Sequence, residues 1–115
     1  MRHLYLKRER ALACFAIAYH CVIGQSIEDH RLWLQNQDRH ALMAAHDPNS
    51  VRNGETICIE LNEAPSSLFV VAYQEHGELT TQELAIPAGY EDLYFLVSTV
   101  YDGNRQLYLE LKQMS

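Results

Sequence analysis

The sequence predicts a mainly β protein, a single antiparallel β-sandwich of Ig-like or jelly-roll-like type, with residues 1–115 forming one domain. Three observations support this prediction. Several short apolar runs are rich in β-branched and aromatic residues, as strands usually are. Turn residues separate these runs at intervals of about 10 to 15 residues, which is typical of sandwiches and barrels. One separator, Asp102-Gly103, lies between two alternating runs and is a strong hairpin signal.

The N-terminal part of the sequence contains one clear strand and one ambiguous segment. Residues 3–9, HLYLKRE, alternate between apolar and polar side chains and predict a strand. The segment Ala11–Ile23 fits both periods. A helix would align Leu12, Phe15, Tyr19 and Val22, whereas a strand would align Phe15, Ile17, Tyr19, Cys21 and Ile23. We favour the strand, because residues 4–24 then form a hairpin-like opening of the sandwich, but the alanines leave a helix as the competing structure.

The middle of the chain, residues 25–50, has weaker signals. The sequence RLWLQ at 31–35 indicates a short strand. The sequence DRHALMAAH at 38–46 contains good helix formers after Asp38, whose side chain is a suitable N-cap. We therefore expect one short helix around residues 38–46.

The C-terminal half contains the clearest strand patterns. Residues 55–62, ETICIELN, alternate, with Ile57, Ile59 and Leu61 on one face. Residues 67–74, SLFVVAYQ, are apolar on both faces and predict a central strand. Residues 80–87, TTQELAIP, predict a further strand that ends at the proline.

The last two predicted strands form a hairpin, in which Leu93–Tyr101 pairs antiparallel with Arg105–Lys112. With a loop of even length, one face packs into the core; it carries Tyr94, Leu96, Ser98, Val100, Leu107, Leu109 and Leu111. The other face carries Leu93, Phe95, Val97, Tyr108 and Glu110, and its apolar part needs a cover. That cover is either the N-terminal segment or a partner subunit. A loop of three residues would reverse the pairing parity and exchange the two faces.

Composition and charge restrict the partners and the compartment. The chain is acidic, with a net charge of −6, which disfavours binding to nucleic acid or to an anionic membrane surface. The apolar run Ala11–Gly24 follows basic residues, but Tyr19 and His20 interrupt it and no small-x-small cleavage pattern follows, so we expect core rather than a secretory signal. At about 14 residues it is also too short for a membrane-spanning helix. The three cysteines cannot all pair with one another, which favours a cytoplasmic location.

A resemblance supports the predicted fold. The order of an N-terminal LYLKRE strand, a second strand ending in VIG, and the turn and strand NGETICIEL is similar to that of small uncharacterised bacterial β-sandwich domains. Those domains have an Ile-Asp-Gly-like turn, and this chain lacks the aspartate after Ile23. The resemblance covers roughly half of the chain and implies a fold, but it carries over no functional residue.

The segment IEDHRLWLQNQDRHALMAAHD contains the candidate metal ligands, three histidines close to acidic residues: His30, His40, His46, Asp29, Asp38 and Asp47. A transition metal needs three or four converging ligands. The spacings between the histidines do not place two imidazoles on one helix face, which needs intervals of 3, 4 or 7 residues. We therefore favour solvated histidines on a polar connector, with a metal site as the alternative.

Recognisable catalytic and phosphate-binding motifs are absent from the sequence, which predicts no cofactor and favours a non-enzymatic protein. We expect a binding or interaction module for protein–protein contact, as a homodimer through Phe95, Val97 and Tyr108. The first alternative is a metal-binding protein or metal-dependent enzyme that uses the histidines above. The second is a sugar- or small-ligand-binding sandwich that uses Trp33, although Leu32 and Leu34 beside it also suit a core anchor.

Overall fold

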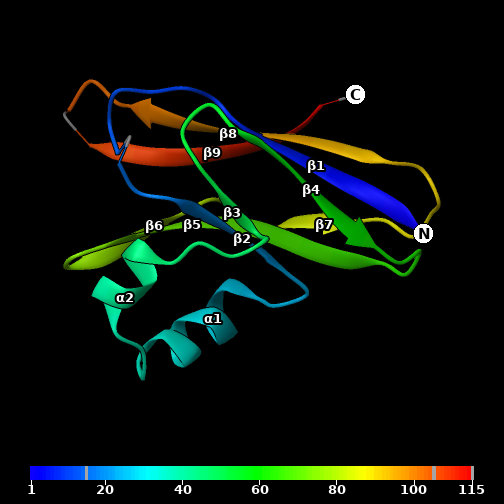
Figure 1. The fold of residues 1–115 in the computed structure, drawn as a ribbon, viewed down its shortest axis with the longest axis horizontal. Coiled ribbons are helices and arrows are strands. Elements are labelled where there is room, and N and C mark those ends of the chain that lie inside the picture. The colour runs from blue at the N-terminus through cyan, green and yellow to red at the C-terminus, as the bar shows by residue number, and fades with distance from the viewer. Residues whose placement is uncertain (15, 105, 115) are drawn as a thin grey trace.

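Two β-sheets and two helices make up the computed structural model, which describes residues 1–14, 16–104 and 106–114 (Figure 1). The strands are β1 (Arg2–Arg8), β2 (Tyr19–Ile23), β3 (Ser50–Val51), β4 (Thr56–Leu61), β5 (Ser66–Gln74), β6 (Gly77–Thr80), β7 (Leu84–Ile86), β8 (Leu93–Tyr101) and β9 (Leu107–Met114). The helices are α1 (Ile27–Leu34) and α2 (Arg39–Ala44). The predicted mainly β sandwich is confirmed.

The first sheet has the strand order β4-β1-β8-β9, and the second has the order β3-β2-β5-β6, with β7 also paired to β5. All strand pairs are antiparallel except β1 with β8, which run parallel. The sandwich is therefore mostly, but not wholly, antiparallel. The prediction that residues 67–74 form a central strand is confirmed, because β5 has neighbours on both sides.

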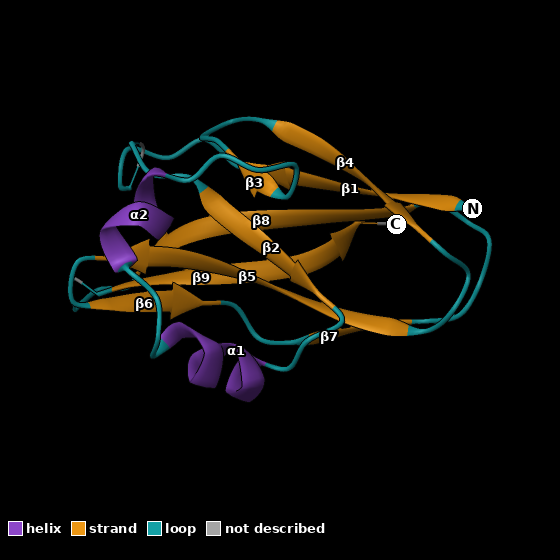
Figure 2. Cartoon of the chain, turned by 60° about the horizontal axis from the view of Figure 1, so that its bottom comes forward, coloured by secondary structure: helices purple, strands orange, loops and turns teal. Residues whose placement is uncertain are grey.

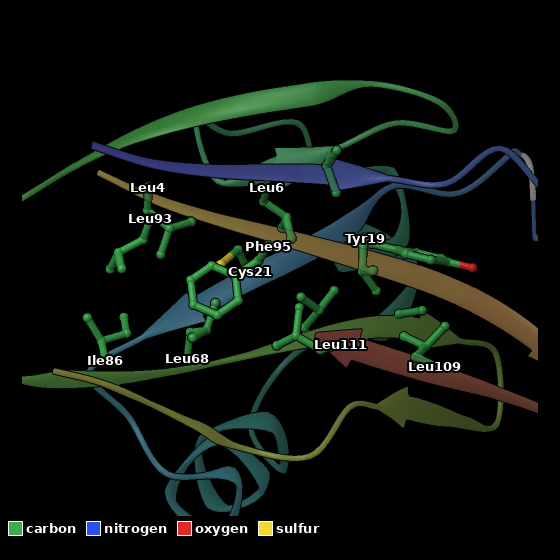
Figure 3. Packing of buried hydrophobic residues seen from close by; sticks show 14 residues of the cluster. Leu4, Leu6, Tyr19, Cys21, Leu68, Ile86, Leu93, Phe95, Leu109 and Leu111 are labelled. Carbon is green, nitrogen blue, oxygen red and sulfur yellow. The ribbon is translucent and has the colours of Figure 1, made fainter. Parts of the chain in front are cut away.

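The main core lies between the two sheets, where side chains from both inner faces meet (Figure 3). The alternation of β4 has the predicted sense, since Ile57, Ile59 and Leu61 pack against this core. In β5 the inward residues are Leu68, Val70 and Ala72, all with no exposed surface. Burial of such side chains supplies most of the stabilisation that holds the two sheets together.

The register of the β8–β9 hairpin differs from the expected one. The strands pair as predicted, but Tyr101 stands opposite Leu107, so an odd number of residues separates them and the parity is reversed. Phe95 and Val97 are 2% and 0% exposed and point into the core, as Figure 3 shows for Phe95. The predicted dimer interface through Phe95 and Val97 is therefore wrong. Arg105, the expected start of the second strand, lies outside the described residues.

The segment after β1 is neither the helix nor the long strand that its sequence allows. Only Tyr19–Ile23 is a strand, and residues 11–14 and 16–18 form turns and loop; Phe15 lies outside the described residues. Arg8 explains this arrangement. Its buried guanidinium donates to the carbonyls of Cys14, Ile17 and Val51 at 2.8, 2.6 and 3.2 Å. These bonds tie the turn before β2, and Val51 of β3, to the end of β1.

The two helices form a third layer on the outer face of the β2–β5 sheet (Figure 1). Figure 2, which turns this side toward the viewer, shows α1 below the strands and α2 at their left end. A second apolar cluster lies beneath them, built on Phe69, Val71 and Tyr73 of β5 and Leu34 of α1. The alternating residues of β5 thus face two different cores, which explains why this strand is apolar on both faces.

Both helices begin at side-chain caps. The Ser26 hydroxyl accepts a hydrogen bond from the backbone N–H of Asp29 at the start of α1. The Asp38 carboxylate accepts from the N–H of His40, so the predicted short helix within residues 38–46 and its N-cap are confirmed. The short strand expected at residues 31–35 is wrong, because most of this stretch belongs to α1. None of the helices in the described parts of the chain is long and apolar enough to cross a membrane.

Candidate ligand pocket

A cavity of about 480 Å³ lies where the helical layer meets the outer face of the second sheet. Strands β2 and β5, helices α1 and α2, and the segment before β3 all contribute to its wall. The lining residues are His20, Cys21, Val22, Ile23, Gln25, His30, Trp33, Leu42, Ala45, Asp47, Pro48, Asn49 and Tyr73. Its size falls in the range of small-molecule sites, and its position, between elements distant in sequence, is common for such sites.

Four aromatic rings form a continuous group in this cavity. Tyr73 of β5 lies between the two imidazoles, with ring centroids 5.1 Å from His20 and 5.9 Å from His30. The His30 ring in turn lies 5.1 Å from the indole of Trp33. Tyr73 and both histidines are nearly buried, whereas Trp33 is 42% exposed. The floor of the pocket is therefore made of covered rings and its rim carries an accessible indole.

His20 is a buried imidazole with incomplete hydrogen bonding. Its Nδ1 lies 3.3 Å from the Ser50 hydroxyl and 3.7 Å from a carboxylate oxygen of Asp47. Its Nε2 is buried and forms no hydrogen bond with the described residues. Burial lowers the pKa of His20 below its usual 6.5, against the smaller opposing effects of Asp47 and the Leu42 backbone carbonyl. The ring is therefore mostly neutral near pH 7.

His30 and Tyr73 form a buried polar pair. The Tyr73 hydroxyl lies 2.8 Å from Nε2 of His30. Burial lowers the pKa of His30, although the carboxylate of Glu78 favours its charged form. Burial also raises the pKa of Tyr73 to about 12, so the phenol keeps its proton. Both groups are neutral at physiological pH, which satisfies the expectation that buried polar groups are uncharged and hydrogen-bonded.

The structure separates the candidate metal ligands. His30 is buried against Tyr73 and Trp33, which also contradicts its assignment to a solvated connector. His40 and His46 are exposed, as are Asp29, in the first turn of α1, and Asp38, the N-cap of α2. Asp47 alone joins His30 in the cavity. Within residues 1–14, 16–104 and 106–114, no three His, Cys, Asp or Glu side chains are placed to hold a metal ion.

Trp33, proposed from the sequence as a ligand-binding residue, does line the cavity, and its exposure contradicts the core-anchor alternative. Sequence reasoning missed His20 and Tyr73. A signal existed for each of them. His20 interrupts an apolar run, and Tyr73 falls on the second apolar face of β5, which required a cover from elsewhere in the chain.

No family model, no curated protein and no solved structure matches this chain. The similarity to small bacterial β-sandwich domains consequently stays a prediction.

The geometry beside the pocket argues against nucleophilic catalysis by Ser50 with His20 and Asp47. In a catalytic triad, the histidine uses one nitrogen for the nucleophile and the other for the carboxylate. Here Ser50 and Asp47 both approach Nδ1 of His20, so no proton relay can connect them. Burial also raises the pKa of Cys21 to about 12, which keeps that thiol protonated and weakly nucleophilic. The arrangement is suited to binding.

Proposed function

We propose that this protein is a small-ligand-binding domain whose ligand occupies the pocket between the second sheet and the helices. One observation carries the proposal. Rings from β2, β5 and α1 meet in one hollow of about 480 Å³, where the buried His20, His30 and Tyr73 lie behind the exposed indole of Trp33. A hollow of this size with an accessible aromatic ring at its rim is typical of small-molecule sites.

The proposal favours non-enzymatic binding over catalysis and develops the small-ligand alternative that Trp33 suggested. The pocket combines a mostly apolar and aromatic wall with a few polar groups, which is the usual composition of small-molecule sites. Two of those polar groups, His20 and His30, come from different elements and are fixed by contacts with Ser50 and Tyr73. A site fixed in this way is preorganised, which reduces the entropic cost of binding.

The intrinsic fluorescence of Trp33 provides a direct test, because the chain contains a single tryptophan and it lies at the pocket. The purified protein is titrated with a library of ammonium compounds, neutral polyols and carboxylates of small size. We expect at least one class to change the emission saturably and to raise the melting temperature. A ligand at 100 times its Kd stabilises the fold by about 2.7 kcal/mol.

A pair of variants identifies the pocket as the binding site. Ala45 lines the cavity, whereas its neighbour Ala44 is exposed and does not. We expect Ala45→Leu to narrow the cavity and weaken the response, and Ala44→Leu to leave it intact. If no class in the library gives a saturable change or thermal stabilisation, the proposal fails. The proposal is also contradicted if Ala45→Leu and Ala44→Leu bind the ligand equally well, because the ligand would then bind outside the pocket.

A second candidate, self-association, is supported by the outer face of the first sheet. Tyr94 and Tyr108 of this face are 47% and 46% exposed, and the ring of Tyr94 stacks on that of Tyr5 at 5.1 Å. The register places Met114 beside Tyr94, which extends the apolar row across three strands. A second copy of this chain, presenting the same row, would cover it in a two-fold dimer. Tyr108 thus remains in the proposed interface, whereas Phe95 and Val97 do not.

Sedimentation measurements over a range of concentrations test the dimer. We expect a concentration-dependent mass that Tyr94→Glu reduces to that of one chain. Tyr90→Glu is the matched control, because Tyr90 is 76% exposed but lies in the loop before β8. A mass of one chain at every concentration would contradict self-association.

We also propose a bacterial, cytoplasmic protein. The three cysteines are unpaired and Cys58 is exposed. Exposed free thiols persist best in a reducing compartment, which supports the location. Alkylation of intact cells followed by mass spectrometry tests the location, and we expect Cys58 to be alkylated as a free thiol. A disulfide-linked Cys58 in the isolated native protein would contradict a reducing compartment.

A further inference from the structure

We infer that the ligand of this pocket is a small organic cation, a compound with an ammonium or methylated ammonium group. The inference rests on the proposed function, because it names the chemistry of the ligand at the same site. Two features of the pocket support it, the sign of the charge in its wall and the aromatic character of that wall.

The charge in the pocket wall is negative. Asp47 is the one Asp, Glu, Lys or Arg side chain among the lining residues, and about half of it is exposed. The arginine of α2, Arg39, is already paired with Glu78 at 2.8 Å and also donates to the carbonyl of Gly77. Arg52 lines a neighbouring hollow together with Asp47, but Glu55 lies there as well. The net charge of −6 adds to the local preference for a cation.

The rings of the pocket suit a cation as well. The face of an aromatic ring attracts a positive charge, and tryptophan does so most strongly. Trp33 presents the most exposed ring in the pocket, and the buried ring of His30 packs against it at 5.1 Å, which limits the orientations of the indole. The ring of Tyr73 extends the aromatic surface inward, toward His20. Aromatic rings are a common means of binding quaternary ammonium groups.

Anions are disfavoured by the same wall. A carboxylate or phosphate would meet Asp47 and would find no lysine or arginine among the lining residues. His20 and His30 do not supply the missing positive charge at neutral pH, because burial lowers the pKa of each imidazole. A neutral ligand of similar shape would gain the contact with Trp33 but not the attraction to Asp47.

Three probes of nearly the same shape separate these possibilities. Choline is the cation. The neutral isostere is 3,3-dimethylbutan-1-ol, in which a tert-butyl group replaces the trimethylammonium group. The anion is 3,3-dimethylbutanoate. Binding is followed by Trp33 fluorescence and by calorimetry. A cation–π contact contributes about 0.5–2 kcal/mol, so we expect choline to bind roughly 2- to 30-fold more tightly than its isostere. We expect the anion to bind most weakly.

A matched pair of variants tests the role of the carboxylate. Asp47→Asn removes the charge but keeps an oxygen for the N–H of Asn49, which Oδ1 of Asp47 accepts at 2.8 Å. Asp102→Asn makes the same change in a similar turn, where Oδ1 accepts from Asn104 at 2.8 Å, outside the pocket. We expect Asp47→Asn to weaken choline binding severalfold without changing the binding of the isostere. Asp102→Asn should change neither.

The outcomes distinguish the inference from the proposed function. If the neutral isostere or the anion binds as tightly as choline, or if Asp47→Asn has no effect, the ligand is not a cation, but the pocket still binds ligands. If other library members bind and no ammonium compound does, the pocket likewise binds ligands that are not cations. If neither the probes nor any library member changes Trp33 fluorescence or the melting temperature, the proposed function itself fails.

Discussion

The hydroxyl of Tyr73 lies 2.8 Å from Nε2 of His30, and both side chains are almost completely buried. Tyr73 belongs to β5 and His30 to α1, so this hydrogen bond joins the sheet to the helical layer. Phe69, two positions along the same face of β5 from Val71, also contacts the ring of His30, with the centroids 5.4 Å apart. The pocket thus depends on a polar contact within an otherwise apolar layer.

Removal of the Tyr73 hydroxyl tests this contact. Tyr73→Phe keeps the ring but leaves Nε2 of His30 buried without a partner, which is expected to destabilise the protein by about 1–3 kcal/mol. The midpoint of urea denaturation measures the change. Tyr108→Phe, at a side chain that is 46% exposed and makes no hydrogen bond to the described residues, should change the free energy of unfolding little. Equal effects of the two changes would show that the contact contributes no stability.

The buried histidines predict a dependence of stability on pH. The folded-state pKa values of His20 and His30 lie below the usual 6.5, because burial disfavours the charged rings. Below pH 6.5 the unfolded chain therefore binds more protons than the folded one, and stability rises with pH. The stabilisation is complete above pH 6.5 and is lost as the pH falls from there toward the folded-state values. Each histidine contributes a slope of at most about 1.4 kcal/mol per pH unit.

Denaturation curves between pH 5 and pH 8 measure this slope. Titratable neighbours act on both rings: Asp47 and His46 on His20, and Glu78 and His20 on His30. His30→Gln should flatten the curve. His76→Gln, at an exposed position between β5 and β6, should leave it unchanged. A slope that is the same in both variants would exclude His30 as a source.

Alternate residues of β8 have opposite environments, which predicts opposite responses to truncation. Phe95 is 2% exposed in the main core, so Phe95→Ala should cost about 3–5 kcal/mol of stability. Tyr94 is adjacent but 47% exposed on the outer face, so Tyr94→Ala should cost much less. Guanidinium denaturation compares the two. A larger effect at Tyr94 would restore the register that the sequence suggested and contradict the observed one.

Local sequence patterns predicted the elements of the sandwich better than their pairing. The alternation of residues 55–62 identified β4 and its inward face, and Asp102-Gly103 identified the final hairpin. The parity of that hairpin depends on how many residues the turn holds outside the ladder, which composition does not determine. The sequence did not predict helix α1, because Leu32 and Trp33 are exposed and the apolar residues therefore do not follow the buried face of the helix.

The candidate site was harder to predict than the fold because its contacts connect distant parts of the chain. His30 and Tyr73 lie 43 residues apart, and His20 and Ser50 lie 30 apart. A single sequence contains no record of such contacts. The density of His and Asp in residues 27–47 pointed to the correct region but suggested a metal site. In the structure this region covers the outer face of β5.

The buried guanidinium of Arg8 predicts that lysine cannot replace arginine at this position. Its two terminal nitrogens donate to the backbone carbonyls of Cys14, Ile17 and Val51, and its carbon lies 3.4 Å from the ring centroid of Tyr19. A lysine ammonium cannot reproduce the planar fork, so Arg8→Lys should lose hydrogen bonds to these carbonyls and cost about 1–3 kcal/mol. Arg52→Lys, at an exposed position, makes the same substitution and should be nearly neutral. Urea denaturation of both variants measures the difference.

Since β1 and the turn that precedes β2 meet at this guanidinium, hydrogen exchange in Arg8→Lys should rise first at residues 16–18. Uniform exchange across the sandwich would instead indicate that Arg8 stabilises the whole fold rather than this segment.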